Sequence, residues 1–157
     1  MNVMEEQQQR ERIRTVIHKY CRAIDERRFD DVMASFSADA KIKHGSYNDT
    51  AKNFVGFLSN VLNRMEDTLH TLGGIIVEFE RHDLAHSHAT FTSFHRISAK
   101  HAKVGPVVTN GVDTDWIVAG RYRDTLQLIE GEWKIIDRIG STDWDRVEPS
   151  RGSVSLA

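Results

Sequence analysis

Apolar residues in the first part of the chain recur every three or four positions, as they do along one face of an amphipathic helix. One such stripe spans residues 13–24, and a shorter one spans residues 29–36. A third spans residues 54–65 and follows three N-cap candidates at residues 48–50. The pattern therefore predicts three helices, with a short strand at residues 40–44 between the second and the third.

After residue 65 the apolar pattern changes from a helical period to alternation. Four segments are rich in β-branched and aromatic residues, which is typical of strands: residues 69–80, 84–100, 115–129 and 132–144. Residues 81–83 and the pair Glu130-Gly131 fit tight hairpin turns between them. Helices followed by antiparallel strands predict an α+β fold, in which a curved sheet closes over a long helix and encloses a pocket.

The chain of 157 residues has the length of one domain, and we expect a single domain over residues 1–157 with an ordered core at about 6–146. The tail at residues 147–157 has few apolar residues and is not expected to be ordered. Residues 100–114 form the longest predicted loop, which is long enough to cover the mouth of a pocket.

Charge and cysteine content exclude several classes of protein. Lys and Arg total 21 against 23 Asp and Glu, and the basic residues are scattered, which argues against a nucleic-acid partner. Cys21 is the only cysteine, so no internal disulfide forms, and a reducing compartment suits the chain. Residues 1–12 lack the apolar core of an export signal, and no run approaches a membrane span. We therefore expect a cytoplasmic protein without a membrane partner.

Motifs for nucleotide cofactors and for acyl-enzyme chemistry are missing from the sequence. It has no glycine-rich phosphate loop, no nucleophile elbow and no cysteine-nucleophile motif. His86 and His88 lie two residues apart on a predicted strand, but only Asp83 offers a nearby carboxylate. We therefore predict no metal and no cofactor.

Asp25 and His70 are candidates for acid–base chemistry. Asp25 lies just beyond the edge of the first apolar stripe. Its carboxylate faces either the cavity or, as the start of the charged run at residues 25–28, the solvent. His70 opens the first long strand, where it is either a base or an ordinary structural histidine. The sequence leaves open whether the two side chains meet.

Further candidates lie on the predicted strands and on the first helix. Small and aromatic residues share one face of the second strand, where they either leave room for a ligand or accommodate a helix: Ala89, Phe91, Ser93 and His95. We add Trp116 on the next strand to these pocket candidates. Arg138, expected on the face of Ile136, either neutralises an anion or pairs with a neighbouring carboxylate. Tyr20 lies in the first stripe, and a buried hydroxyl needs a partner, which a substrate oxygen could supply.

Taken together, these patterns resemble the SnoaL-like group of the nuclear-transport-factor-2-like superfamily. The resemblance rests on residues 20–25 and 36–40, on His70 opening a strand that ends Val77-Glu78-Phe79, and on residues 120–124 and 130–135 with Arg138. It spans about residues 6–144. Within the group the chain is most similar in function to scytalone dehydratase, hexachlorocyclohexane dehydrochlorinase and bile-acid 7α-dehydratase.

The resemblance implies roles for the candidate residues. It makes His70 the base and Asp25 the residue that orients it, Arg138 a group that serves the leaving group, and His95 a second histidine of the site. Tyr20 stands where the dehydrochlorinase has a lysine, which favours an oxygen leaving group. Tyr20 or His95 would donate a hydrogen bond to a substrate oxygen.

The expected function is a cofactor-independent lyase or isomerase that removes a proton from a small, largely apolar cyclic or aromatic-derived molecule. The alternative is a non-catalytic ligand-binding or assembly domain, such as the β subunit of a ring-hydroxylating dioxygenase, which would show a filled cavity or Asp25 in solvent. A polyketide cyclase or an epoxide hydrolase on the same fold is also open. The resemblance further implies a homodimer or homotrimer that pairs through the outer sheet face, with which Thr90, Thr92 and Phe94 are compatible.

Overall fold

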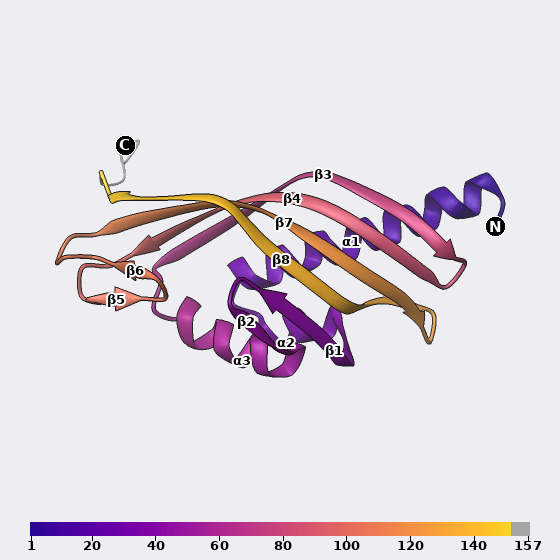
Figure 1. The fold of residues 1–157 in the computed structure, drawn as a ribbon, viewed down its shortest axis with the longest axis horizontal. Coiled ribbons are helices and arrows are strands. Elements are labelled where there is room, and N and C mark those ends of the chain that lie inside the picture. The colour runs from indigo at the N-terminus through magenta and orange to yellow at the C-terminus, as the bar shows by residue number, and fades with distance from the viewer. Residues whose placement is uncertain (152–157) are drawn as a thin grey trace.

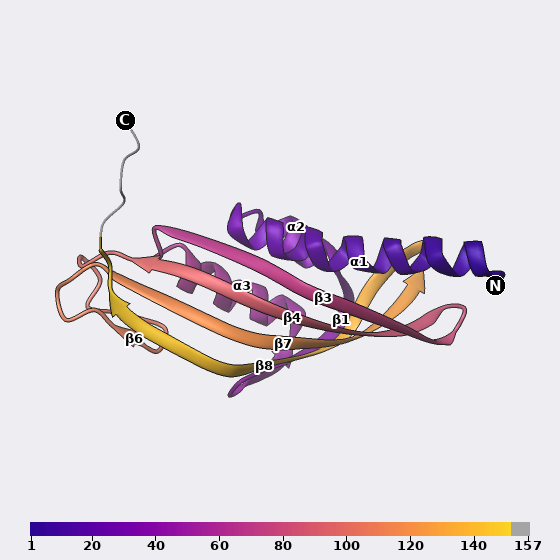
Figure 2. The same cartoon turned by 90° about the horizontal axis from the view of Figure 1, so that it is seen from above.

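Three helices lie on the concave side of a strongly curved sheet (Figure 1). The computed structural model describes residues 1–151. The helices are α1 (Val3–Asp25), α2 (Phe29–Ala34) and α3 (Ala51–Leu62). Seen from above, α1 runs along the edge of the sheet that β3 forms (Figure 2). The predicted α+β fold, with a curved sheet over a long helix, is confirmed.

Six strands make up the sheet, in the order β2-β1-β8-β7-β4-β3. Only β1 and β8 pair in parallel, while the other neighbours are antiparallel. The strands are β1 (Phe36–His44), β2 (Tyr47–Thr50), β3 (Asp67–Arg81), β4 (Leu84–Ile97), β7 (Thr114–Ile129) and β8 (Glu132–Pro149). Because β1 joins the far side of β8, the segment after α2 is brought beside the last strand of the chain.

The predicted elements match the observed ones closely in the middle of the chain and less well at its ends. Helix α1 begins ten residues before the apolar stripe, because Asn2 and Glu5 form a capping box over its first turn. Thr50 is the N-cap of α3. Strand β8 continues to Pro149, so residues 147–149 of the predicted tail are paired with β7, while the rest of that tail beyond residue 151 lies outside the described residues.

Both predicted hairpin turns are present. Arg81 pairs with Leu84 across the first turn. In the second, Glu130 and Gly131 both have positive φ, of 50° and 80°, as the two central residues of a type I′ turn require. The predicted loop at 100–114 contains a small hairpin of β5 (Lys103–Val104) and β6 (Val107–Val108), whose Val104 and Val107 are buried.

The register of β8 differs from the predicted alternation. Thr125 of β7 pairs with Asp137, whereas Leu126 pairs with Ile135, so Ile136 is an extra residue in the ladder. Such a β-bulge shifts the alternation by one position. Arg138 therefore faces inward with Ile135, and our prediction that it shares the face of Ile136 was wrong.

The outer face of the sheet carries exposed apolar side chains. Leu69, Phe94 and Ile117 are aligned across β3, β4 and β7, and Leu69 and Phe94 are exposed. Trp144, which is also exposed, pairs with Ala119. Self-association through this face stays a prediction. Within residues 1–151, no helix has the length and apolar character that crossing a membrane demands.

Candidate active site

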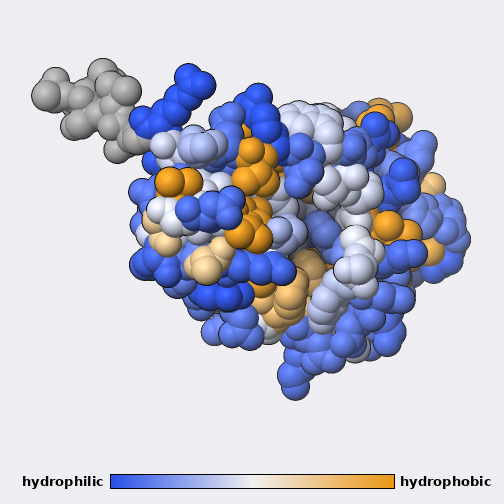
Figure 3. Space-filling view, turned by 60° about the vertical axis from the view of Figure 1, so that its left-hand side comes forward, coloured by the Kyte–Doolittle hydropathy of each residue, from blue (hydrophilic) through white to orange (hydrophobic). Residues whose placement is uncertain are grey.

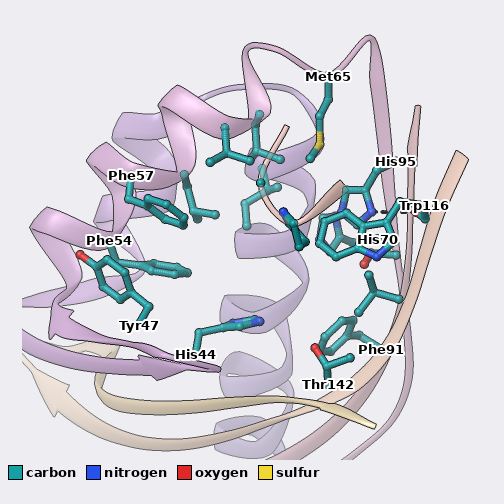
Figure 4. A pocket seen from close by; sticks show the side chains of 18 of the residues that line it. His44, Tyr47, Phe54, Phe57, Met65, His70, Phe91, His95, Trp116 and Thr142 are labelled. Atoms are coloured by element: carbon teal, nitrogen blue, oxygen red, sulfur yellow. Dashed lines mark hydrogen bonds between the residues drawn. The ribbon is translucent and has the colours of Figure 1, made fainter. Parts of the chain in front are cut away.

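An apolar cavity lies between α3, the β5–β6 hairpin and the inner face of the sheet. Its volume is about 190 Å³. Aromatic and aliphatic side chains of α3 form one wall, and β3, β4 and β7 form the opposite wall (Figure 4). At this end of the molecule, apolar residues gather beside a hollow in the surface (Figure 3). Among residues 1–151, none of those that line it is Asp, Glu, Lys or Arg. An ionic ligand would therefore find no opposite charge on the cavity wall.

His70 and Asp25 meet at the edge of this cavity. Nδ1 of His70 lies 2.7 Å from Oδ1 of Asp25, and the backbone N–H of His70 donates to Oδ2 over 2.8 Å. Because a carboxylate only accepts, Nδ1 carries the proton, and in the neutral ring Nε2 has a free lone pair. His70 lines the cavity, and its Nε2 makes no hydrogen bond to any residue that the structure describes. The Asp25 carboxylate therefore fixes the orientation of an imidazole that lines the cavity.

A supporting network explains why Asp25 turns away from solvent. Arg27 has a positive φ of 58°, which ends α1 and folds its side chain back. Its guanidinium donates to the carbonyls of Ile24 and Asp25 and, over 2.6 Å, to the hydroxyl of Thr68. Thr68 in turn donates to Asp25. Only 16% of the Asp25 side chain is exposed, so the charged run at residues 25–28 is not uniformly solvated.

Hydrogen bonds stabilise the ionised form of Asp25. Burial raises the pKa of this carboxyl, but the bonds from the His70 side chain and backbone and from Thr68 outweigh burial and bring the pKa below its usual range. Asp25 is therefore ionised at neutral pH.

His95 lines the cavity beside His70, and their rings meet edge to face with centroids 5.7 Å apart. Its Nδ1 lies 3.0 Å from the carbonyl oxygen of Trp116, which can only accept (Figure 4). Burial and the nearby His70 lower the pKa of His95 to about 4, so the ring is neutral and its Nε2 is an acceptor. In this tautomer the single N–H of His95 is bonded to the backbone, which disfavours His95 and leaves Tyr20 of the two donors that we expected.

Of the other predicted pocket residues, all but Ala89 line the cavity. Tyr20 lines the cavity, and burial raises its pKa to about 12, so its hydroxyl keeps its proton. Phe91, Ser93 and Trp116 also line the cavity. Ala89 does not line the cavity. It lies two residues before Phe91 on β4 and is buried in the hydrophobic core, so our prediction that it contacts the substrate is not supported.

Arg138 does not line the cavity either. Its guanidinium is fully buried and makes two 2.7 Å hydrogen bonds to Asp124. Its central carbon lies 4.0 Å from the ring centre of Tyr20 and 4.4 Å from that of Tyr122. Burial lowers the pKa of Arg138, but Asp124 raises it to a net value above the ordinary one. The alternative of an ion pair is thus observed, and the guanidinium packs against two tyrosines that line the cavity.

His44 is a cavity residue that we did not predict. It ends β1, and its ring stacks on Phe54 with centroids 6.0 Å apart. The available signal was the alternation of Ala40, Ile42 and His44, which puts the histidine on the same face as two core residues. Tyr47, Phe57, Met65 and Thr142, from four further segments, were missed as well.

We expect two neutral cavity histidines, the half-buried His44 and the buried His95, to make the fold acid-sensitive. The pKa of His44, like that of His95, is lowered to about 4, mainly by burial, against about 6.5 in an unfolded chain. Between these values the unfolded chain binds protons that the folded chain does not, so the free energy of unfolding falls as pH falls from 6.5 to 4. Each histidine contributes about 3 kcal/mol to this loss.

Urea unfolding at pH 7 and at intervals down to pH 4 measures this loss. The matched control is His95→Gln, which removes one titrating group and should flatten the curve by about half. A stability that is constant from pH 6.5 to 4 would contradict the prediction.

The family model of the SnoaL-like domain matches residues 5–139. A protein named "Putative Scytalone Dehydratase" from Novosphingobium aromaticivorans superposes with a TM-score of 0.76 at 19% identity, covering 98% of this chain and 97% of that one. A hexachlorocyclohexane dehydrochlorinase from Novosphingobium barchaimii gives a TM-score of 0.75 at 16% identity, covering 96% and 95%. No curated protein matches the sequence. At these identities the superpositions establish the shared fold.

Proposed function

Since the chain belongs to the SnoaL-like domain family, we propose that it is a cofactor-independent lyase or isomerase of the dehydratase type. The substrate would be a small, uncharged, largely apolar cyclic molecule. The observation that carries the proposal is the 2.7 Å contact between His70 and Asp25 at the edge of an apolar cavity, with the second imidazole nitrogen free.

The size and polarity of the cavity support the substrate class. An apolar cavity of on the order of 150 Å³ is enough to hold benzene, so about 190 Å³ suits one substituted ring. A carboxylate or phosphate would have to give up its hydration without a cation in return, because Arg138 is paired with Asp124 away from the cavity wall. The proposal therefore excludes anionic substrates.

The proposed reaction needs no external reagent. Nε2 of His70 takes a proton from carbon next to an electron-withdrawing group, and Asp25 stabilises the imidazolium that forms. The electron pair left on carbon then expels a β-hydroxyl, which takes the proton back from His70 and leaves as water. Tyr20, which keeps its proton, could donate to the departing oxygen. In an isomerase the same proton would return to another carbon.

The open cavity and the partly buried Asp25 disfavour the non-catalytic alternative, which called for a filled cavity or a solvated carboxylate. Similarity to a dehydratase and a dehydrochlorinase in fold adds to the proposal, although fold alone does not fix a reaction.

A screen for proton abstraction tests the proposal. Wild-type protein is incubated in D2O with neutral cyclic ketones and with cyclic β-hydroxy ketones, and NMR follows deuterium uptake while ultraviolet absorption follows enone formation. We expect turnover of at least one member and a loss on the order of 10²- to 10⁴-fold in His70→Gln, which lacks the base. The control is His82→Gln, on the exposed turn between β3 and β4. Equal rates in wild type and His70→Gln would refute the assignment of His70.

A further inference from the structure

His44 holds a position in the cavity that the proposed reaction has not used. It enters from the end of β1, whereas His70, His95 and Trp116 lie together on the far wall (Figure 4). The Nδ1 atom of His44 is buried and has no hydrogen-bond partner among the residues that the structure describes. A polar side chain that is held in an apolar cavity without a protein partner is a candidate for contact with a ligand.

Gly140 holds the imidazole in place. His44 and Gly140 face each other in the parallel pair of β1 and β8. A Cβ atom at position 140 would come within 2.4 Å of Nδ1 and 3.0 Å of Cε1 of His44, which is closer than atoms approach without displacement. Phe54 stacks on the ring at an interplanar angle of 19°, and Tyr122 meets it at 62°. The ring is therefore confined, with Nδ1 turned toward the strand.

This placement decides which nitrogen carries the proton. A buried N–H without an acceptor is among the rarest features of folded proteins, whereas an acceptor lacking one partner is tolerated more often. With Nδ1 against Gly140 and unpartnered, the favoured tautomer has its proton on Nε2. Burial, Arg138 and His70 lower the pKa of His44 to about 4, so the ring stays neutral at pH 7.

The three cavity histidines thus differ in what they offer. In the neutral rings, Nε2 of His70 and Nε2 of His95 are both acceptors. The Nδ1–H of His70 is bonded to Asp25, and the Nδ1–H of His95 is bonded to the Trp116 carbonyl. His44 alone among them would present an N–H. Removal of a proton next to a carbonyl moves negative charge onto the carbonyl oxygen, which a neutral N–H donor stabilises.

We propose that His44 is a catalytic hydrogen-bond donor, whose Nε2–H holds the carbonyl oxygen of the substrate across the cavity from His70, and that the substrate is therefore a neutral cyclic ketone or enone. The assignment rests on the proposed function, since His44 would stabilise the negative charge that proton abstraction by His70 creates. Gly140 is a positioning residue in this scheme, because it acts only by leaving room for the ring.

Two measurements test the assignment without relying on turnover. The first is ¹⁵N–¹H NMR of the imidazole nitrogens, assigned by comparison with His44→Gln. We expect His44 with its proton on Nε2 and neutral at pH 7. A proton on Nδ1, or a charged ring at that pH, would overturn the assignment whether or not His70 is a base.

The second measurement compares binding of cyclohexanone with binding of methylenecyclohexane, which has the same shape but no oxygen. We expect wild type to prefer the ketone by about tenfold and His44→Leu to lose the preference, as removal of one neutral donor predicts. His44→Gln, whose amide nitrogen reaches the position of Nε2, should restore it, and His44→Asn should not. A preference that persists in His44→Leu, or one that is absent from wild type, would overturn the proposal.

Turnover provides the link to mechanism. With any ketone that the wild type processes, His44→Leu should lower kcat by on the order of 10²-fold with a smaller change in KM. Gly140→Ala should have a similar effect in the wild type and almost none in the His44→Leu background. Additive effects of the two substitutions would show that Gly140 does not act through His44.

Discussion

Replacing Asp25 with asparagine should lower kcat of the proposed reaction by a factor on the order of 10³ to 10⁴, the range expected when the residue that orients a catalytic histidine is lost. The reason lies in the hydrogen bonds of this carboxylate. Oδ2 accepts from the backbone N–H of His70, which cannot reverse its role. The asparagine must therefore keep its carbonyl oxygen there and turn its NH2 group toward Nδ1 of His70. The histidine then becomes the Nε2–H tautomer, which has no lone pair facing the cavity.

The measurement is kcat for a substrate found by the screen, together with ¹⁵N NMR of His70. We expect the His70 proton to move from Nδ1 to Nε2 in Asp25→Asn, a signature that general destabilisation would not produce. Thr68→Val is the matched control, because it removes the 3.2 Å bond to the same carboxylate without changing the tautomer. Full activity of Asp25→Asn would contradict the dyad, and an unchanged tautomer would contradict the argument given for it.

Arg138→Met should lower the free energy of unfolding by about 3 to 5 kcal/mol, the cost of leaving one partner of a buried ion pair alone. Both side chains of the Arg138–Asp124 pair are fully buried, and the guanidinium also lies over the rings of Tyr20 and Tyr122. Removal of Arg138 leaves the Asp124 carboxylate without its cation in the core. In the double variant Arg138→Met/Asp124→Leu, most of the loss should be recovered, since no charge stays buried.

Urea unfolding monitored by tryptophan fluorescence measures these differences. Arg121→Met is the control: its pair with Asp143 has a similar length of 2.8 Å but is largely exposed, so we expect a change below about 1 kcal/mol. A small loss in Arg138→Met would mean that the buried pair is not structural. Stability close to wild type combined with a specific loss of kcat would return Arg138 to the leaving-group role that the family resemblance implies.

The amino-acid sequence by itself determined the elements of the fold and part of the site. The three helices, the four long strands and both hairpin turns follow from apolar period and turn residues, which depend on neighbours within a few positions. Tyr20, Phe91, Ser93 and His95 were also found in this way, because each lies on the inward face of its own helix or strand. For the His70–Asp25 pair the residues suggested the chemistry, but the pairing came from the family resemblance.

Tertiary structure alone decided which of these residues meet. His70 and Asp25 are 45 positions apart and come together only because β3 packs along α1. A bulge at Ile136, which depends on pairing with β7, turned Arg138 inward to Asp124. His44 entered the site because β1 lies in parallel beside β8, opposite Gly140. Local periodicity carries no information about contacts between distant segments, so the donor and acceptor role of each histidine could be read only from its partners in space.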